Sequence, residues 1–258
     1  MQRYILRDLV ILLGVFGLIW IVASLFSYPE DPQLLSISQE EKLGEAYLDV
    51  VLLNPMFGEF ENAVVDSAVK VIGHRLEKSL EHSEYNYSFT VFDSEMINAF
   101  TLPGGNILIS TGLMKFCGTP EELAAVMAHE MGHVEKRHVV ARLIKELGLE
   151  LITSTDPYVM GEVTGMLTST RFDRKQEEEA DRFASELLEH SAIEPRTLAT
   201  LFRKLEEETG NELLEHFEVI STHPNFRSRI REALSYTPEN DFKPEPFTLD
   251  WEQIQSQL

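Results

Sequence analysis

The chain has 258 residues, enough for one domain of ordinary size with a short appendage and too few for two full domains. Its 43 aspartates and glutamates outnumber 22 lysines and arginines, and the resulting formal charge of -21 excludes nucleic acid as a partner. The single cysteine, Cys117, excludes an intrachain disulfide. We interpret the acidic excess as a solvated surface, with attraction of basic substrates as the alternative.

An uncharged apolar run over residues 9–26 predicts one transmembrane helix near the N-terminus. At helical rise the run covers about 27 Å, just enough to cross the hydrocarbon core. Arg3 and Arg7 precede it, so we expect residues 1–8 in the cytoplasm and the rest of the chain on the periplasmic or extracytoplasmic side. A cleaved signal peptide is the alternative, but the run is too long for one and no A-x-A-like site follows. Residues 27–37 then form a linker.

Residues 38–236 are predicted to form a mostly helical α+β domain with one small antiparallel sheet, followed by a C-terminal tail at 237–258. Alternation of aromatic and β-branched residues predicts a strand at 86–92, and NILIS at 106–110 predicts a second one after a Pro-Gly-Gly break. Segment 157–170 is interpreted as core, with a mobile lid as the alternative. Apolar residues at helical spacing predict helices at 38–53, 61–80, 121–151, 171–190, 195–208, 212–220 and 226–236.

The predicted helix at 121–151 contains the motif HEMGH. A spacing of four places His129 and His133 on one helical face, so both imidazoles can bind a single tetrahedral zinc ion. Glu130 lies beside them as the predicted general base, which takes a proton from a water molecule whose pKa the ion lowers. Because five residues can recur by chance, a third ligand on another helix is needed to establish the site.

The predicted helix at 171–190 supplies a third ligand. Its run QEEEAD places Glu177 and Asp181 one turn apart on one face. Glu177 is therefore predicted to bind zinc, and Asp181 to accept a hydrogen bond from the free ring nitrogen of a histidine ligand. Glu178 and Glu179 are rotated away, and we expect them on a solvated face.

The remaining histidines lack ligand spacing. His138 lies five residues after His133 and therefore off its face, which excludes His138 as a ligand. We interpret the others as ordinary helix or turn residues, at positions 74, 82, 190 and 216.

The sequence resembles the zinc metallopeptidase family that includes the CAAX prenyl protease, HtpX and BepA. The resemblance covers about residues 38–234 and rests on four segments in the family's order: INAFTLPGG (97–105), HEMGH (129–133), EEEAD (177–181) and HPNFRSRI (223–230). It implies a gluzincin-type domain with one zinc ion per chain, with Glu177 as the third ligand and Asp181 behind the ligands. The chain lacks the several membrane spans of the prenyl protease and the helical repeats of BepA, so neither prenylated substrates nor a repeat-bound partner is implied.

The HP motif adds His223 and Arg229 to the candidate site. The resemblance implies that the histidine can occupy the open zinc position and keep the enzyme latent, as in BepA-like members. His223 and Arg229 are also suited to stabilise the oxyanion of the tetrahedral intermediate. From the sequence, both roles of His223 stay open.

The predicted substrate-binding residues belong to the segment around the Pro-Gly-Gly break. We expect residues 106–110 to be an edge strand beside the metal helix, where an extended peptide would add by main-chain hydrogen bonds. An ordinary sheet edge is an equal alternative. The residues concerned are Asn98, Gly105, Asn106, Ile107, Leu108 and Ile109.

These observations predict a membrane-anchored zinc metalloendopeptidase that cleaves polypeptides. Unfolded or mislocalised envelope proteins are the substrates that the resemblance implies. One alternative is a zinc-stabilised chaperone or binding protein in which His223 closes the fourth zinc position and no hydrolysis occurs. Another is a secreted protease released by cleavage after the apolar run. The sequence gives no indication of the oligomeric state.

Overall fold

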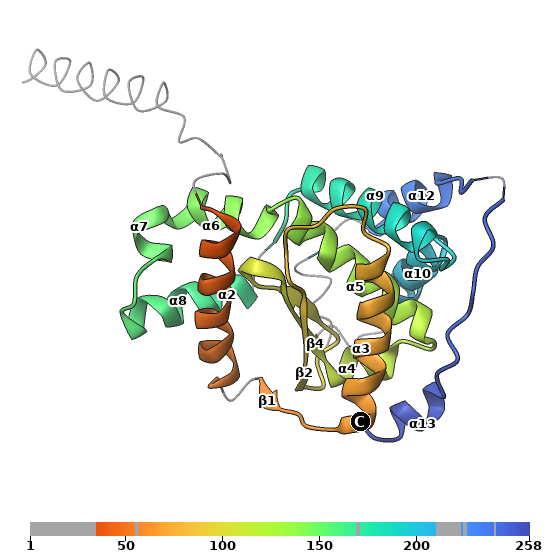
Figure 1. The fold of residues 1–258 in the computed structure, drawn as a ribbon, viewed down its shortest axis with the longest axis horizontal. Coiled ribbons are helices and arrows are strands. Elements are labelled where there is room, and N and C mark those ends of the chain that lie inside the picture. Colours follow the sequence, from red (N-terminus) through yellow and green to blue (C-terminus); the bar gives the residue numbers. More distant parts are fainter. Residues whose placement is uncertain (1–34, 55–56, 169–170, 210–222, 224–225, 240) are drawn as a thin grey trace, which may run out of the picture.

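The structure is a computed structural model that describes residues 35–54, 57–168, 171–209, 223, 226–239 and 241–258. Helices predominate around one four-stranded sheet, which agrees with the predicted α+β class (Figure 1). The predicted membrane segment at 9–26 and the predicted helix at 212–220 lie outside these residues. None of the helices that the structure describes combines the length and apolar character needed to span a membrane.

Two predicted helices open the described part of the chain. α2 (Ile37–Leu52) begins at a capping box between Ser36 and Gln39. α3 (Ala63–Lys78) begins at Asn62, whose side-chain oxygen accepts hydrogen bonds from two backbone N–H groups of the first turn. Both helices start where the sequence offers a polar cap just before an apolar periodic run.

The sheet has the strand order β1-β2-β4-β3. β2 and β4 pair in parallel, so the predicted antiparallel pairing of these two segments is wrong. The reason is β3, which has three residues and is too short to show an alternating pattern. It pairs antiparallel with β4, and the turn η2 reverses the chain between them, so β4 inserts between β2 and β3. The bounds are β1 (Gly58–Glu59), β2 (Ser88–Asp93), β3 (Ala99–Thr101), η2 (Pro103–Gly105) and β4 (Asn106–Ser110).

β4 is a central strand with both of its edges paired. Residues 106–110 lie opposite β2, and residues 107–109 lie opposite β3. The expectation of an edge strand at 106–110 is therefore wrong, because neighbouring strands occupy the backbone groups that a peptide would need. This correction applies to main-chain substrate binding at Asn106, Ile107, Leu108 and Ile109. Substrate binding at Gly105, which belongs to the turn η2, stays a prediction. Asn98 is likewise engaged, since its backbone exchanges hydrogen bonds with Ser110.

The predicted helix at 121–151 is divided into three helices. α5 (Pro120–Glu135) begins at Thr119, whose hydroxyl accepts a hydrogen bond from a first-turn N–H at 3.2 Å. The chain then breaks at Arg137, which has a left-handed φ of 55°. α6 (His138–Leu147) follows, and after a second break comes α7 (Leu149–Ile152).

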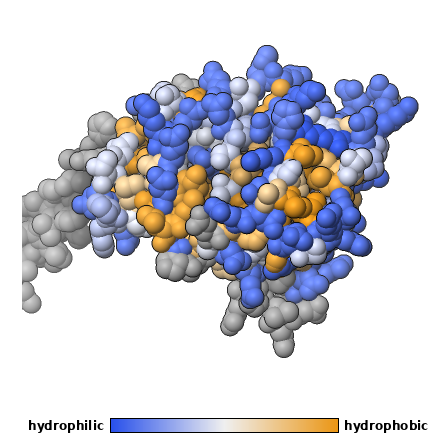
Figure 2. All heavy atoms as spheres, turned by 60° about the horizontal axis from the view of Figure 1, so that its bottom comes forward, coloured by the Kyte–Doolittle hydropathy of each residue, from blue (hydrophilic) through white to orange (hydrophobic). Residues whose placement is uncertain are grey.

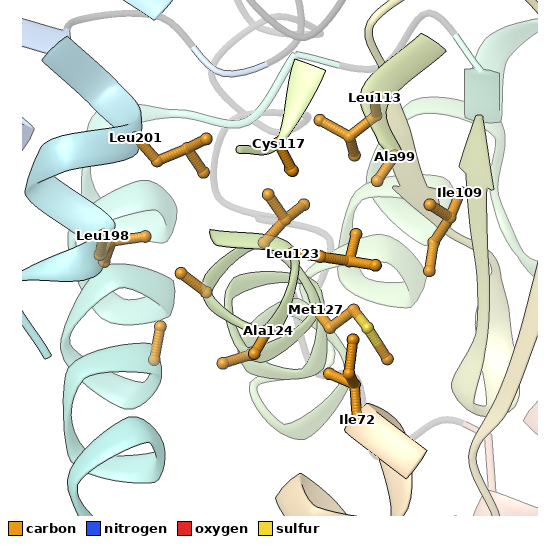
Figure 3. Packing of buried hydrophobic residues seen from close by; sticks show 14 of the residues in the cluster. Ile72, Ala99, Ile109, Leu113, Cys117, Leu123, Ala124, Met127, Leu198 and Leu201 are labelled. Carbon is orange, nitrogen blue, oxygen red and sulfur yellow. The ribbon is translucent and has the colours of Figure 1, made fainter. Parts of the chain in front are cut away.

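α5 runs through the middle of the main hydrophobic core. Its Leu123, Ala124 and Met127 are fully buried, among apolar side chains from neighbouring helices and strands that include Ile72 and Ile109 (Figure 3). Apolar contact on every side leaves little freedom to the backbone that carries the HEMGH motif. The helices that follow in sequence are α8 (Pro157–Thr168), α9 (Arg174–His190) and α10 (Thr197–Thr209).

The segment predicted as core or lid contributes to a second apolar cluster. Val163 and Leu167 of α8 are buried there, which supports the core interpretation, whereas Tyr158 is 77% exposed. On the face shown in Figure 2, hydrophilic side chains predominate and apolar ones show between them. The hydrophilic part of this surface agrees with the expectation of a solvated exterior.

The C-terminal segment returns along one side of the molecule after α12 (Phe226–Ser235) and ends beside α3 (Figure 1). It ends in α13 (Trp251–Gln255). The indole N–H of Trp251 donates to the carbonyl of Cys117 at 2.8 Å, and Ile254 is also buried in the main core. The tail is therefore docked just before the start of α5 through Trp251 and Ile254.

Candidate metal centre

Four buried side chains with metal-binding atoms converge in the described structure. His129 and His133 come from α5, Glu177 from α9, and His223 from the segment before α12. One nitrogen or oxygen atom from each residue lies within 4.8 Å of the corresponding atoms of the others. The structure thus brings the three predicted ligands together and adds His223 as a fourth member.

The close approach of α5 and α9 depends on Gly132 within the HEMGH motif. A Cβ atom at this position would lie 3.0 Å from the backbone of Ala180 in α9, which is tighter than an ordinary contact, so a larger residue would push the two helices apart by a few tenths of an ångström. The capping box between Asp173 and Gln176 fixes the start of α9. Together these features place Glu177 opposite the two histidines of α5.

The distances between the four groups fit a tetrahedral ion. Nε2 of His129 lies 3.1 Å from Nε2 of His133 and 3.3 Å from Nδ1 of His223. Oε1 of Glu177 lies 2.9 Å from Nδ1 of His223 and 3.6 Å from Nε2 of His133. Ligands bound at zinc distances in tetrahedral geometry are separated by about 3.3 to 3.4 Å. The donor set of imidazoles and one carboxylate is also the set that zinc prefers.

The charge states of His133 and Glu177 agree with a metal site. Burial, followed by the neighbouring histidines, lowers the pKa of His133 well below its ordinary value, so the ring is neutral. Burial alone would raise the pKa of Glu177, but His223 and Arg229 lower it to about 2, so the carboxylate is ionised. Its buried Oε2 lies 2.8 Å from Nη1 of Arg229, yet it accepts no hydrogen bond from any described residue. A neutral imidazole at His133 and an ionised carboxylate at Glu177 are forms that bind a divalent cation. Burial alone would lower the pKa of His223, but the adjacent Glu177 carboxylate raises it above its ordinary value, so His223 has to release a proton before it can bind a metal ion.

Asp181 lies behind His129, as predicted. Its Oδ1 is 2.9 Å from Nδ1 of His129. Burial alone would raise the pKa of Asp181, but Arg229 holds it well below its ordinary value. The ionised carboxylate accepts the Nδ1–H proton, which leaves Nε2 of His129 as a lone-pair donor facing the centre of the group.

Arg229 is buried behind the acidic side chains of the group, with 2% of its side chain exposed. Its Nε and Nη2 each donate to Asp181 at 2.7 Å, in a bidentate pair. Nη1 lies 2.8 Å from Glu177 and also donates to the backbone carbonyl of His223 at 3.3 Å. The guanidinium additionally stacks over the ring of Phe202 at 4.1 Å.

Glu130 is buried beside the four-residue group. The hydroxyl of Thr101 in β3 donates to its Oε2 at 2.7 Å. Its Oε1 lies 3.6 Å from Nε2 of His223. The predicted general base is therefore oriented by the sheet on one side and faces His223 on the other.

Four residues at the site escaped the sequence analysis. Thr101 was quoted only as part of a longer motif, and a three-residue strand carries no periodic signal. Phe172 stacks on the ring of His133 with centroids 3.8 Å apart. Nε2 of His138 lies 3.1 Å from Oε2 of Glu179 behind His133, and Glu179, which was expected on a solvated face, is 41% exposed. The contact of Glu179 with His138 depends on the break at Arg137, which turns His138 back toward α9, and the QEEEAD run alone gives no sign of that break.

Comparison with known proteins places the chain among metalloproteases. Residues 64–237 match the model of peptidase family M48. The chain is 28% identical over 222 residues to the beta-barrel assembly-enhancing protease of Escherichia coli (strain K12), across 77% of this chain and 44% of that protein. It is 32% identical over 151 residues to the mitochondrial metalloendopeptidase OMA1 of Arabidopsis thaliana, across 57% of this chain and 30% of that protein.

A shorter relative gives a similar result. The metalloprotease LoiP of Escherichia coli (strain K12) is 30% identical over 155 residues, across 56% of this chain and 60% of that protein. The chain thus spans under half of the length of the beta-barrel assembly-enhancing protease that it matches.

Proposed function

The chain belongs to peptidase family M48, and we propose that it is a zinc-dependent endopeptidase held in a latent state. The observation that carries this proposal is the convergence of His129, His133, Glu177 and His223 within 4.8 Å of one another. The resemblance found in the sequence is confirmed by the family match over residues 64–237.

His129, His133 and Glu177 would hold the zinc ion, one per chain. When bound, such an ion polarises the scissile carbonyl and lowers the pKa of a water molecule toward neutrality. Asp181 supports this set by accepting the Nδ1–H proton of His129, which fixes the orientation of that ring.

Glu130 acts as the general base and then as the general acid. It takes a proton from the attacking water and gives it to the leaving amine. Thr101 keeps one carboxylate oxygen occupied by a hydrogen bond of 2.7 Å, so the other oxygen is directed toward His223 and the four-residue group. Proton transfer therefore depends on space becoming free where His223 now lies.

His223 is assigned here as the fourth ligand of the latent state. Structural zinc sites are closed by four protein ligands, whereas catalytic sites keep three and leave one position open. Nδ1 of His223 lies 3.3 Å from Nε2 of His129 and 2.9 Å from Oε1 of Glu177, and these distances support a role as a ligand. Activation would require this ring to withdraw, and an oxyanion role for His223 would belong to that open state.

Arg229 is assigned a positioning role. Its nitrogens are engaged by Asp181, by Glu177 and by the backbone of His223, so in the described conformation it does not point a free donor toward a substrate. It holds the two carboxylates in place, and the prediction that it stabilises the oxyanion stays a prediction.

Polypeptides are the proposed substrates, in particular unfolded or mislocalised envelope proteins. Arg3, Arg7 and the apolar run at 9–26 support a single-pass membrane anchor with the catalytic domain on the extracytoplasmic side. A relative that is named for the assembly of β-barrels is consistent with such substrates. β3 is the outer strand beside α5, so an extended peptide would add at β3 rather than at β4.

A zinc-stabilised binding protein is the second candidate, and the four-ligand arrangement favours it, because closed sites are typical of structural zinc. Casein digestion by His223→Ala protein and by the double variant His223→Ala/Glu130→Gln separates the two candidates. The endopeptidase account expects His223→Ala to cleave casein and the double variant to cleave it at least roughly 100-fold more slowly. Equal inertness of both at saturating zinc, with binding of unfolded chains retained, would establish the second candidate.

A further inference from the structure

His133 contacts a second histidine on the side of its ring that faces away from the four-residue group. Its Nδ1 lies 3.0 Å from Nδ1 of His138, and both rings are buried. Nε2 of His138 in turn lies 3.1 Å from Oε2 of Glu179, whose side chain is 41% exposed. The three side chains form one hydrogen-bonded line from the buried centre to solvent.

The break between α5 and α6 brings His138 to this place. In an unbroken helix a residue five positions after His133 would point to a different face. Arg137 instead adopts a left-handed φ of 55°, and its Nε donates to the buried carboxylate of Glu40 at 2.8 Å. The turn redirects the chain, so that the first residue of α6 folds back onto the last histidine of the motif.

The positions of the protons follow from the role of His133. A neutral imidazole that presents Nε2 to a metal carries its single proton on Nδ1. Among the described residues, Nδ1 of His138 is the atom placed to accept that proton, so it must carry its own proton on Nε2. Glu179 is placed to accept this second proton, so every donor in the line has an acceptor.

We propose that His138 and Glu179 are positioning residues for the metal ligand His133. They fix its tautomer and hold its ring, as Asp181 does for His129 on the other side of the centre. The inference rests on the proposed zinc function. Each histidine of the motif thus has its own supporting carboxylate on α9. Asp181 contacts His129 directly, and Glu179 supports His133 through the ring of His138.

Zinc affinity tests the inference with a readout other than activity. Dissociation constants are measured by competition with a chromogenic chelator, and coordination by the visible absorption spectrum of the cobalt(II)-substituted protein. His138→Leu should weaken zinc binding roughly 10- to 100-fold and alter the cobalt spectrum. His138→Asn, whose side-chain oxygen can accept from Nδ1 of His133, should recover most of the affinity.

Glu179→Ala provides a variant that leaves the buried rings untouched, and Glu178→Ala is its matched control on the same helix. Glu178 pairs only with the exposed Arg174 among the ion pairs of the described residues. We expect roughly tenfold weaker zinc binding for Glu179→Ala and no more than about twofold for Glu178→Ala. Thermal unfolding of the metal-free proteins checks that each variant folds.

The outcomes distinguish the inference from the function on which it rests. If the wild type binds zinc tightly and all four variants match it in affinity and cobalt spectrum, the positioning role is wrong while the metal site stands. Equal weakening by His138→Asn and His138→Leu, with Glu179→Ala unchanged, would show that only ring packing matters. A wild type that binds no zinc overturns the proposed function and this inference with it.

Discussion

Nδ1 of His223 lies 3.3 Å from Nε2 of His129, at the position of a fourth ligand. Under the proposed function, the four donors would close a tetrahedral site and leave no position for solvent at a bound ion. We therefore interpret this conformation as one in which the residues for hydrolysis are assembled and His223 blocks access to the ion.

Removal of the His223 side chain should activate the enzyme. We expect His223→Ala to raise kcat/KM for casein roughly tenfold, or about 1.4 kcal/mol, because a position for solvent opens without loss of the other ligands. The zinc content should remain one ion per chain. A fall in activity at full zinc occupancy would instead make His223 a group that stabilises the transition state.

Thr101 should matter for the rate of catalysis and leave zinc binding unchanged. In the His223→Ala background, Thr101→Val removes the hydrogen bond of 2.7 Å to Glu130, and we expect kcat to fall roughly tenfold. Thr101→Ser should restore most of the rate. Thr90→Val on β2 is the matched control, and a rate for Thr101→Val equal to that control would show that Glu130 needs no such orientation.

The sequence predicts those parts of the site that depend on local helical spacing, but not those that depend on contacts between distant segments. The spacing of His129 and His133 on a helix, and of Glu177 and Asp181 on another, predicts which faces carry the chemistry, because helical geometry is local. The contact between His133 and His138 is not predictable in this way, since it depends on one left-handed residue held by a distant carboxylate. The central position of β4 likewise depends on β3, whose three residues carry no pattern.

Arg229 should be essential for stability, because it neutralises two buried carboxylates. Arg229→Met leaves Asp181 and Glu177 without their cation, and we expect a loss of about 3 to 5 kcal/mol in the free energy of urea unfolding. The free energy of unfolding of Arg229→Lys should lie between those of the wild type and Arg229→Met, since an ammonium group cannot form the bidentate pair with Asp181. Arg227→Met removes an arginine whose side chain is 88% exposed and serves as the control. Equal stability of the Arg229→Met and Arg227→Met proteins would contradict this role.

The stability of the metal-free protein should depend on the ionisation of Glu177 at acidic pH. His223 and Arg229 lower the pKa of this carboxyl from an ordinary 4.5 to about 2 against the opposing effect of burial. Because the carboxyl has a lower pKa in the folded than in the unfolded protein, its ionisation stabilises the folded state at pH values above the unfolded-state pKa. This stabilisation is lost as the pH falls to the folded-state pKa. The unfolding free energy of wild type minus that of Glu177→Gln should thus be constant above about pH 4.5 and decrease toward pH 2. A difference that does not change with pH over this range would show that the folded carboxyl has an ordinary pKa.

The central claim is that side chains from α5 and α9 together hold one zinc ion, and metal analysis of three purified proteins tests it most directly. Zinc is quantified by atomic emission in wild type, Glu177→Ala and the control Glu178→Ala after dialysis against a weak chelator. The account predicts one zinc ion per chain in the wild type and the control, and less than about a tenth of that in Glu177→Ala. Full zinc occupancy in Glu177→Ala, or none in the wild type after reconstitution, would contradict it.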